Sequence, residues 1–338
     1  MPKSAPVRMG IAGTGSLGFH HTRIAGELED VERVGFFEPR SQRADEVRSK
    51  LGARPFDSLD ELLDEIDALI IATPTTTHRD VAEAALKRGV HLFIEKPIAA
   101  SLEEADRILE AADRSGALVQ IGHVERFNDA IVGARPYLDT PLFIESHRLA
   151  PFTERGTDVA VVLDLMIHDV DLVQSLVDRP IHEIHATGIP ILTPSVDIAN
   201  ARISFEGGAV ANLTASRVSM ERMRKLRIFQ RSGYLSLDLA TGTGEFLRLK
   251  EDLPALRSVQ NGEALQGLLA TDIGAIIERI PLSAEPAEPL RREQESFRDA
   301  VLGRRETPVP GIQGRRALET ALAIESHILR HVADSRSE

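Results

Sequence analysis

The chain has 338 residues, enough for about two domains, and its 40 basic and 52 acidic side chains give a net charge of −12. Its 42% hydrophobic and 27% charged residues are typical of a globular protein and exclude disordered, collagen-like and fibrous classes. The acidic balance disfavours nucleic acid as a partner, and the lack of cysteine excludes disulfides, cysteine-based zinc sites and thiol nucleophiles.

Short apolar runs alternate with helical patterns over the first 122 residues. Ser58 and Ser101 precede two of the helical patterns at positions typical of helix N-caps. The alternation predicts an N-terminal domain over residues 1–122 with a doubly wound parallel sheet of the Rossmann type. The strand-like runs are 7–12, 33–37, 68–72, 91–94 and 118–121, and the helical patterns are 17–28, 42–51, 59–66, 77–88 and 102–114.

A glycine-rich turn, Gly13-Thr14-Gly15-Ser16-Leu17-Gly18, follows the first strand-like run. In this G-x-G-x-x-G pattern the first glycine permits the tight turn, the second lets the backbone approach a pyrophosphate, and the third lets helix pack on strand. Glu38 ends the second run, where a carboxylate accepts hydrogen bonds from the adenosine ribose. Its charge favours NAD over NADP, whereas Arg40 could pair with a 2′-phosphate and keeps NADP open.

The pattern changes after residue 122 and predicts a second domain over residues 123–338. Helical patterns are expected at 128–138 and 158–177 around a strand at 142–149. Residues 181–249 read mainly as strands, with hairpin signals at 206–208 and 231–233. We expect an α+β domain with a large, mostly antiparallel open sheet. Helices are expected at 290–302 and 314–332, and whether they pack back on the first domain is left open.

Two later clusters of residues carry side chains that could take part in catalysis. Glu95-Lys96-Pro97 ends the fourth strand-like run, at the carboxyl edge of the sheet where doubly wound folds bind ligands. Asp164 and His168 are four positions apart in a mostly apolar helical pattern, and therefore share one face of an α-helix.

Together with the glycine turn, these motifs resemble the Gfo/Idh/MocA family of oxidoreductases over nearly the whole chain. The resemblance implies a Rossmann domain followed by a domain whose open sheet often forms the oligomer interface. It also implies that Glu95, Lys96 and the loop at 72–78, with Thr73, Pro74, Thr75 and His78, line the nicotinamide half of the cofactor. The motifs that carry the resemblance are 13–18, 72–78, 95–97, 164–168 and the closing pattern at 295–326 with Phe297, Pro308, Val309, Gly311 and 317–319.

A narrower likeness is to the subgroup that contains UDP-N-acetylglucosamine 3-dehydrogenases of lipid A biosynthesis, on residues 122–128, 145–148, 155–158 and 216–218. Those enzymes oxidise the 3-hydroxyl of the sugar with NAD, and an aminotransferase then converts the ketone to an amine. A nucleotide-sugar pyrophosphate needs cations on an acidic protein. The candidate cations are Arg126, Arg148, Arg155, Arg217, Arg222 and Arg224.

The expected activity is oxidation of a secondary hydroxyl of a sugar, for which a base must reach the hydroxyl proton. His168 is the first choice as base, with Asp164 orienting it or the substrate and Lys96 stabilising the developing alkoxide, although Lys96 could equally be the base. An inositol or free-sugar dehydrogenase is the alternative substrate assignment. The alternative outside the class of enzymes is a non-catalytic regulator that senses the cofactor.

The remaining expectations concern metal binding, membranes, localisation and oligomeric state. No metal is expected, because no His-x-x-x-His cluster occurs. No apolar run is long enough for a membrane helix and no export signal is visible, so we expect a cytoplasmic protein with no membrane partner. Asn212, Thr214 and Ser216 make one face of a strand too polar for a core, and with the resemblance this favours a homodimer or homotetramer.

Overall fold

The computed structural model describes residues 5–153, 159–250 and 273–335. It divides into two compact units. Unit 1 contains residues 1–127 and 287–322, and unit 2 contains residues 128–286 and 323–338. This division differs from the predicted domain boundary after residue 122. The helix α10 (Pro289–Val301) and the first part of α11 (Gly311–Ser335) belong to unit 1. Among the described residues, no helix combines the length and apolarity needed to cross a membrane.

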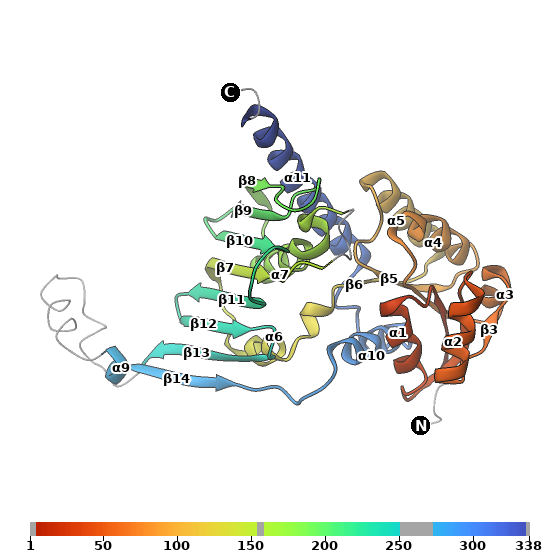
Figure 1. The fold of residues 1–338 in the computed structure, drawn as a ribbon. Coiled ribbons are helices and arrows are strands. Elements are labelled where there is room, and N and C mark those ends of the chain that lie inside the picture. The colour runs from red at the N-terminus through yellow and green to blue at the C-terminus, as the bar shows by residue number, and fades with distance from the viewer. Residues whose placement is uncertain (1–4, 154–158, 251–272, 336–338) are drawn as a thin grey trace, which may run out of the picture. The chain divides into compact units, whose positions relative to one another are not determined.

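Unit 1 is built on a parallel sheet with strand order β3-β2-β1-β4-β5-β6, the arrangement of dinucleotide-binding folds. Its central strands are buried on both faces, as their continuous apolar runs predict. Figure 1 shows α1, α2 and α10 on one side of this sheet and α4 and α5 on the other. The strands are β1 (Val7–Ala12), β2 (Val31–Phe37), β3 (Pro55–Phe56), β4 (Ala68–Ile71), β5 (His91–Glu95) and β6 (Val119–Gly122).

The helices of unit 1 begin and end where the sequence predicts, within a few residues. Ser58 and Ser101 are N-caps, since their side chains accept hydrogen bonds from the backbone N–H groups of Glu61 and Glu104. The helices are α1 (Ser16–Ala25), α2 (Ser41–Leu51), α3 (Leu59–Asp64), α4 (His78–Leu86) and α5 (Leu102–Ser115), with 3₁₀ turns η1 (Thr75–Thr77) and η2 (Val124–Phe127).

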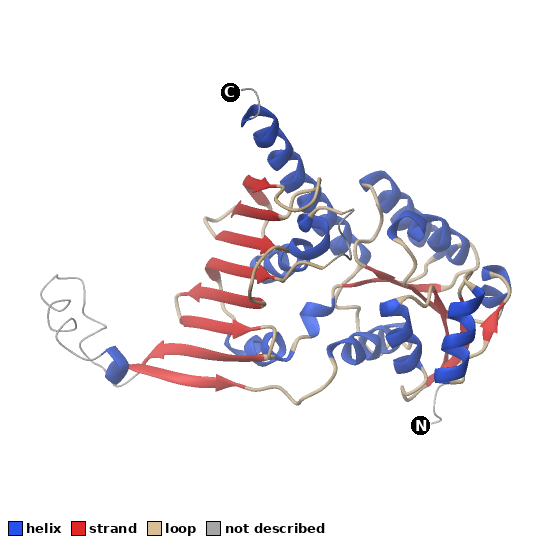
Figure 2. Cartoon of the chain, viewed as in Figure 1, coloured by secondary structure: helices blue, strands red, loops and turns tan. Residues whose placement is uncertain are grey.

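Unit 2 is built on an eight-stranded sheet of order β14-β13-β12-β11-β7-β10-β9-β8 (Figure 2). All neighbouring strands pair antiparallel except β10 and β7, which are parallel, so the expected mostly antiparallel sheet is confirmed. The predicted hairpins at 206–208 and 231–233 join β9 to β10 and β11 to β12. The strands are β7 (Pro141–Leu149), β8 (Ile181–Ile189), β9 (Ile198–Phe205), β10 (Val210–Ser216), β11 (Met223–Gln230), β12 (Gly233–Asp238), β13 (Thr243–Leu249) and β14 (Ile277–Leu282).

The helices of unit 2 correct two predictions. The helix expected at 128–138 is the shorter α6 (Asp129–Ala134) followed by the 3₁₀ turn η3 (Arg135–Tyr137), because Pro136 cannot continue an α-helix. The helix expected at 158–177 begins as a π-helix, η4 (Val162–Met166), before α7 (Ile167–Val177), while residues 154–158 lie outside the described part. A short helix, α9 (Ile273–Ile276), precedes β14.

The glycine turn after β1 fixes how α1 packs against the sheet. A Cβ on Gly18 would lie 2.0 Å from the carbonyl oxygen of Gly13, so only glycine fits there. Gly13 has a φ of +81° and lies against the backbone of Ala72 and Thr73. By contrast, a Cβ on Gly15 would meet no atom within 4 Å. The first and third glycines therefore serve the fold, and the second leaves open space beside the backbone.

We expect Gly18→Ala to destabilise the protein by roughly 3 kcal/mol, because the new methyl group meets backbone that cannot move aside. Gly15→Ala is the matched control and should change the free energy of unfolding by no more than about 0.5 kcal/mol. Urea unfolding followed by circular dichroism measures both. Equal midpoints for wild type and Gly18→Ala would show that the turn is not packed as described.

Candidate functional site

The N-terminus of α1 is open to a ligand. Its N-cap, Gly15, provides no side-chain hydrogen bond, and Leu17 in the first turn is 42% exposed. The backbone N–H groups of a first helical turn have no partner within the helix and carry the positive end of the helix dipole. Together with the open space beside Gly15, they fit the diphosphate of a dinucleotide.

Glu38 lies beside this turn and is held as a carboxylate. Its Oε2 accepts a hydrogen bond from the Thr14 backbone N–H at 2.9 Å, and Arg40 donates to Oε1 at 2.7 Å and to Oε2 at 3.0 Å. Burial alone would raise the pKa of Glu38, but the hydrogen bonds from Arg40 and Thr14 outweigh it and lower the pKa to about 2. The acid predicted to bind ribose is therefore ionised at neutral pH.

His78 contacts the loop that follows β4. This ring is 1% exposed, with Nδ1 3.0 Å from the Pro97 carbonyl oxygen and Nε2 3.1 Å from the Thr73 carbonyl oxygen. Burial lowers the pKa of His78. Both ring nitrogens thus face backbone of the loops that carry Thr73 and Lys96. Pro74 and Thr75 lie in the same loop, at the start of η1.

Glu95, which precedes Lys96, is held by a buried chain of hydrogen bonds. The amide nitrogen of Gln294 donates to His21 Nδ1 at 2.9 Å and also faces the His21 carbonyl oxygen at 3.4 Å, which favours this orientation of the amide. Nδ1 is then an acceptor, so the proton is on Nε2, which donates to Glu95 Oε1 at 2.8 Å. Glu95 Oε2 accepts from the Lys96 backbone N–H at 3.2 Å. The chain fixes the turn that carries Lys96.

In unit 2, Asp164 lies in the π-helix η4 and His168 in the first turn of α7, and both are half-buried. The expectation of one continuous α-helical face is wrong here, because the Ile167 N–H donates to the Val162 carbonyl, five residues back. Single π-helical turns within helices are frequent at functional sites. The irregular turn thus marks the segment on which the sequence places its acid and histidine.

Arg148 supports that segment and does not present a free cation. Its Nε donates to Asp169 Oδ2 at 2.8 Å and its Nη2 to Asp169 Oδ1 at 3.0 Å. The two side chains are 4% and 3% exposed, and removing one partner of such a buried pair typically costs about 3–5 kcal/mol. The pair joins the end of β7 to the residue after His168. The role of Arg148 in binding a substrate pyrophosphate stays a prediction.

Two other predicted substrate ligands are also engaged by the protein. Arg126 is 8% exposed and donates to the Pro308 carbonyl at 3.1 Å and to Gln313 Oε1 at 2.6 Å, all within unit 1. Arg217 is 5% exposed and donates to the Val159 carbonyl, with Asp197 nearby. Buried guanidinium groups need such acceptors, and the predicted contacts of both residues with substrate stay predictions. Arg155 lies outside the described residues, and Arg222 is exposed.

Sequence reasoning missed the residues that support the predicted ones. His21, Gln294 and Asp169 are polar, buried and hydrogen-bonded to Glu95, to His21 and to Arg148, respectively. Asp197 is another: its Oδ2 accepts from the N–H groups of three consecutive residues, 191–193. The available signal was weak, namely an acid directly after His168 and a histidine one turn after Gly18.

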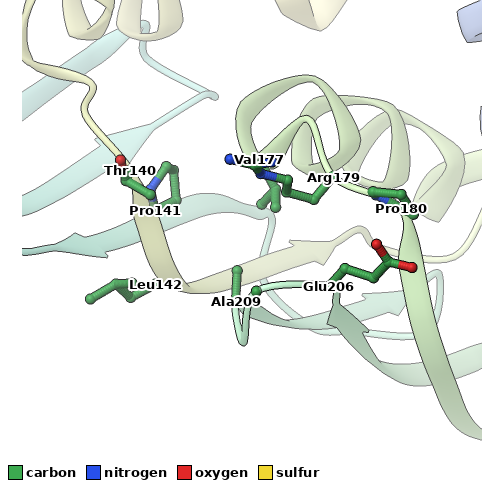
Figure 3. Close-up of a pocket in the computed structure, with 9 residues that line it drawn as sticks. Thr140, Pro141, Leu142, Val177, Arg179, Pro180, Glu206 and Ala209 are labelled. Carbon is green, nitrogen blue, oxygen red and sulfur yellow. The ribbon is translucent and has the colours of Figure 1, made fainter.

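Unit 2 also has a cavity of about 300 Å³ (Figure 3). It is at the C-terminal end of α7, about 14 Å along the helix from His168 at 1.5 Å per residue. Nothing in this cavity matches the predicted site residues. Its lining is Thr140, Pro141, Leu142, Val177, Arg179, Pro180, Glu206, Gly207 and Ala209. Within the described ranges, no group of three or more histidine and acidic side chains could hold a metal ion.

Comparison with known proteins agrees with this geometry. Residues 7–123 match the model of an oxidoreductase family with an NAD-binding Rossmann fold, and residues 131–236 match the Gfo/Idh/MocA C-terminal domain. A UDP-N-acetylglucosamine 3-dehydrogenase of Acidithiobacillus ferrooxidans is 36% identical over 320 residues, 94% of this chain and 96% of that protein. A scyllo-inositol 2-dehydrogenase (NAD⁺) of Bacillus subtilis is 30% identical over 63% of this chain and 68% of its own length.

Solved structures show the same fold. The structure of the Acidithiobacillus ferrooxidans enzyme superposes with a TM-score of 0.84 at 34% identity, covering 96% of this chain and 98% of that one. A scyllo-inositol dehydrogenase from Lactobacillus casei, solved with NAD(H) and scyllo-inositol, superposes with a TM-score of 0.75 at 21% identity, covering 96% and 98%. The chain therefore belongs to the Gfo/Idh/MocA family of NAD-binding oxidoreductases.

Proposed function

We propose that the protein oxidises the 3-hydroxyl of UDP-N-acetylglucosamine to a 3-keto sugar with NAD. The observation that carries this proposal is the 36% identity to an enzyme of that name over 94% of this chain and 96% of the relative. A match across both units includes the substrate-binding half, whereas likeness of the Rossmann half alone would indicate only the cofactor. The ionised Glu38 and the open Gly15 support the cofactor part of the proposal.

The glycine turn at residues 13–18 and Glu38 would hold NAD, which would supply the acceptor for the hydride that leaves the sugar carbon. The hydroxyl proton must pass to a base as the hydride leaves. We assign that role to the His168 imidazole, since a neutral imidazole accepts a proton near pH 7. Asp164 orients His168 or the sugar, and the Lys96 ammonium stabilises the developing alkoxide. Lys96 as the base is the alternative, and the variants below separate the two.

An inositol or free-sugar dehydrogenase is the second candidate. It is favoured by the 30% identity to a scyllo-inositol 2-dehydrogenase, although that match covers 63% of this chain. The burial of Arg126, Arg148 and Arg217 leaves fewer cations for a pyrophosphate than the sequence suggests, and this also favours the smaller substrate. The two candidates differ in the class of alcohol that the enzyme turns over.

The product of the proposed reaction is a ketone, and its chemistry sets the place of the enzyme in a reaction sequence. We propose that an aminotransferase consumes it, giving the 3-amino sugar that a lipid A precursor would carry. Removal of the ketone would also draw the oxidation forward. We also propose that the reaction takes place in the cytoplasm.

The substrate is tested by incubating the protein and NAD separately with UDP-N-acetylglucosamine, other UDP-sugars, inositols and free hexoses, and following absorbance of the reduced cofactor. Each reaction is repeated with an aminotransferase and amino donor to remove the ketone. We expect turnover of UDP-N-acetylglucosamine that increases when the aminotransferase is added. Turnover of an inositol with none of the UDP-sugar would replace the first candidate by the second.

We expect His168→Ala and Lys96→Ala each to bind NADH normally and to lose about 100-fold in turnover, the usual scale for proton transfer or charge stabilisation. Asp164→Asn should lose activity with little change in the unfolding midpoint. If Lys96 is the base, kcat of His168→Ala keeps the wild-type pH profile and Lys96→Ala abolishes it. A folded His168→Ala enzyme with near-normal turnover on its identified substrate at neutral pH would contradict the assignment.

Glu38 should make the enzyme prefer NAD, because its carboxylate bonds the ribose hydroxyls and repels a 2′-phosphate. Glu38→Ser should therefore raise kcat/KM with NADP relative to NAD, and it also leaves Arg40 without its carboxylate partner. Steady-state kinetics with the two cofactors at matched concentration measure the ratio. Better use of NADP than NAD by wild type would show that this role of Glu38 is wrong.

We also propose that copies of the chain associate through the sheet of unit 2. Its helix-facing side chains, such as Ile144 and Leu226, are fully buried, and α6 and α7 pack on that face. The other face carries a stacked aromatic row, in which Phe229 lies 4.6 Å from Tyr234 and 5.8 Å from Phe143 between ring centroids. No described helix covers this row. A symmetric dimer or tetramer would bury it.

Phe229→Lys should lower the mass in light scattering, because an ammonium group would be buried against the partner. Phe229 is 37% exposed, and Leu142, which is 42% exposed and lines the cavity at the C-terminal end of α7, provides the control Leu142→Lys. We expect a homodimer or homotetramer for wild type and for the control. A wild-type monomer at micromolar concentration would end this proposal.

A further inference from the structure

Arg43 contacts the glycine turn from outside the G-x-G-x-x-G pattern. It lies in α2, and its Nε donates to the Thr14 carbonyl oxygen at 2.7 Å while its Nη2 donates to the Gly15 carbonyl oxygen at 2.9 Å. Its Nη1 is 2.6 Å from Glu46 Oε2, and its Cζ lies 5.3 Å from the centre of the Phe19 ring. The side chain is 23% exposed. Four contacts therefore hold the guanidinium against the turn.

The Thr14 and Gly15 carbonyls belong to peptide units whose N–H groups could bind an anion. The Thr14 carbonyl shares its peptide with the Gly15 N–H, and the Gly15 carbonyl shares its peptide with the Ser16 N–H. A cation bonded to a peptide oxygen draws electron density from the nitrogen and strengthens the N–H as a donor. Because the peptide is planar, fixing the oxygen on one side also fixes the N–H on the other.

The charged side chains near the glycine turn also favour binding of an anion there. The protein has a net charge of −12, and Arg43 places a full positive charge directly on the turn. Glu46 offsets this charge only in part, because Glu46 is shared with Lys50, whose Nζ lies 2.7 Å from Oε1. Hydrogen bonds that would orient the turn are thus combined with a guanidinium charge beside the Thr14 and Gly15 carbonyls.

We propose that Arg43 is a positioning residue for the cofactor diphosphate: it orients and polarises the Gly15 and Ser16 N–H groups without touching the ligand. The proposal rests on the NAD-binding assignment of unit 1 and not on the identity of the sugar. It accounts for how the turn could be held in place although its N-cap, Gly15, has no side chain to form a capping hydrogen bond. Arg43 is the described side chain that bonds to both carbonyls.

The test is the Kd of NADH, read from its fluorescence on binding, for Arg43→Met and Arg43→Lys. Loss of two charge-assisted hydrogen bonds should raise Kd on the order of 10-fold or more in Arg43→Met. Lysine keeps the charge but lacks the planar fork, so Arg43→Lys should fall between Arg43→Met and wild type. The matched control is Arg48→Met, since Arg48 lies on the same helix and pairs with an acid three residues away, as Arg43 does.

Ligand fragments separate this role from general disruption. ADP-ribose keeps the diphosphate and should lose affinity for Arg43→Met by the same factor as NADH, whereas adenosine has no phosphate and should bind as to wild type. Loss of adenosine binding as well would show a collapsed site and overturn the proposal. An unchanged Kd for NADH in folded Arg43→Met, or an equal loss in Arg48→Met, would also overturn it. None of these outcomes requires a sugar, so they are independent of the test of the proposed function.

If Arg43→Met does not fold, Arg43→Lys decides the question. A folded Arg43→Lys protein with wild-type affinity for NADH would contradict the need for the guanidinium fork. A measurable loss for NADH and ADP-ribose, with adenosine unaffected, supports it.

Discussion

The arrangement of the candidate site depends on the cost of removing charge from water, which a folded chain meets by pairing each buried charge. Glu38, Glu95, Arg148 and Asp169 are all buried, and each bonds to a group on another part of the chain. Since the partners lie on different elements, each pairing also fixes where two elements meet. The residues next to these charges, Lys96 and His168, are positioned by the same interactions that stabilise each unit.

Lys96 in unit 1 and His168 in unit 2 lie beside different kinds of interaction. Lys96 follows a carboxylate that the His21 ring and the Gln294 amide hold in place, so its support is a chain of hydrogen bonds inside unit 1. His168 precedes an aspartate that forms a bidentate ion pair inside unit 2. A bidentate pair restricts orientation as well as distance. Each of the two candidate side chains therefore adjoins a hydrogen-bonded carboxylate of its own unit.

The sequence was most informative where a local rule decides the structure. Apolar runs located the strands of unit 1, and serine caps located the starts of α3 and α5. It failed for β3, which has two residues, and for the π-helix at Asp164, whose apolar spacing resembles that of an ordinary helix. The roles of the arginines were also inaccessible, because a guanidinium is buried or free according to a partner distant in sequence. Arg126, for example, bonds to Gln313.

The burial of these arginines changes the account of how an acidic protein binds an anionic cofactor. A net charge of −12 repels a long polyanion, which must contact the surface at many points. At physiological ionic strength that repulsion is screened beyond about 8 Å, whereas backbone N–H groups act at hydrogen-bond distance and are not screened there. An open first turn of α1, with its carbonyls bonded to Arg43, therefore suits a single diphosphate. The same protein can hold a dinucleotide and disfavour nucleic acid, because the attraction is local and the repulsion is spread over the surface.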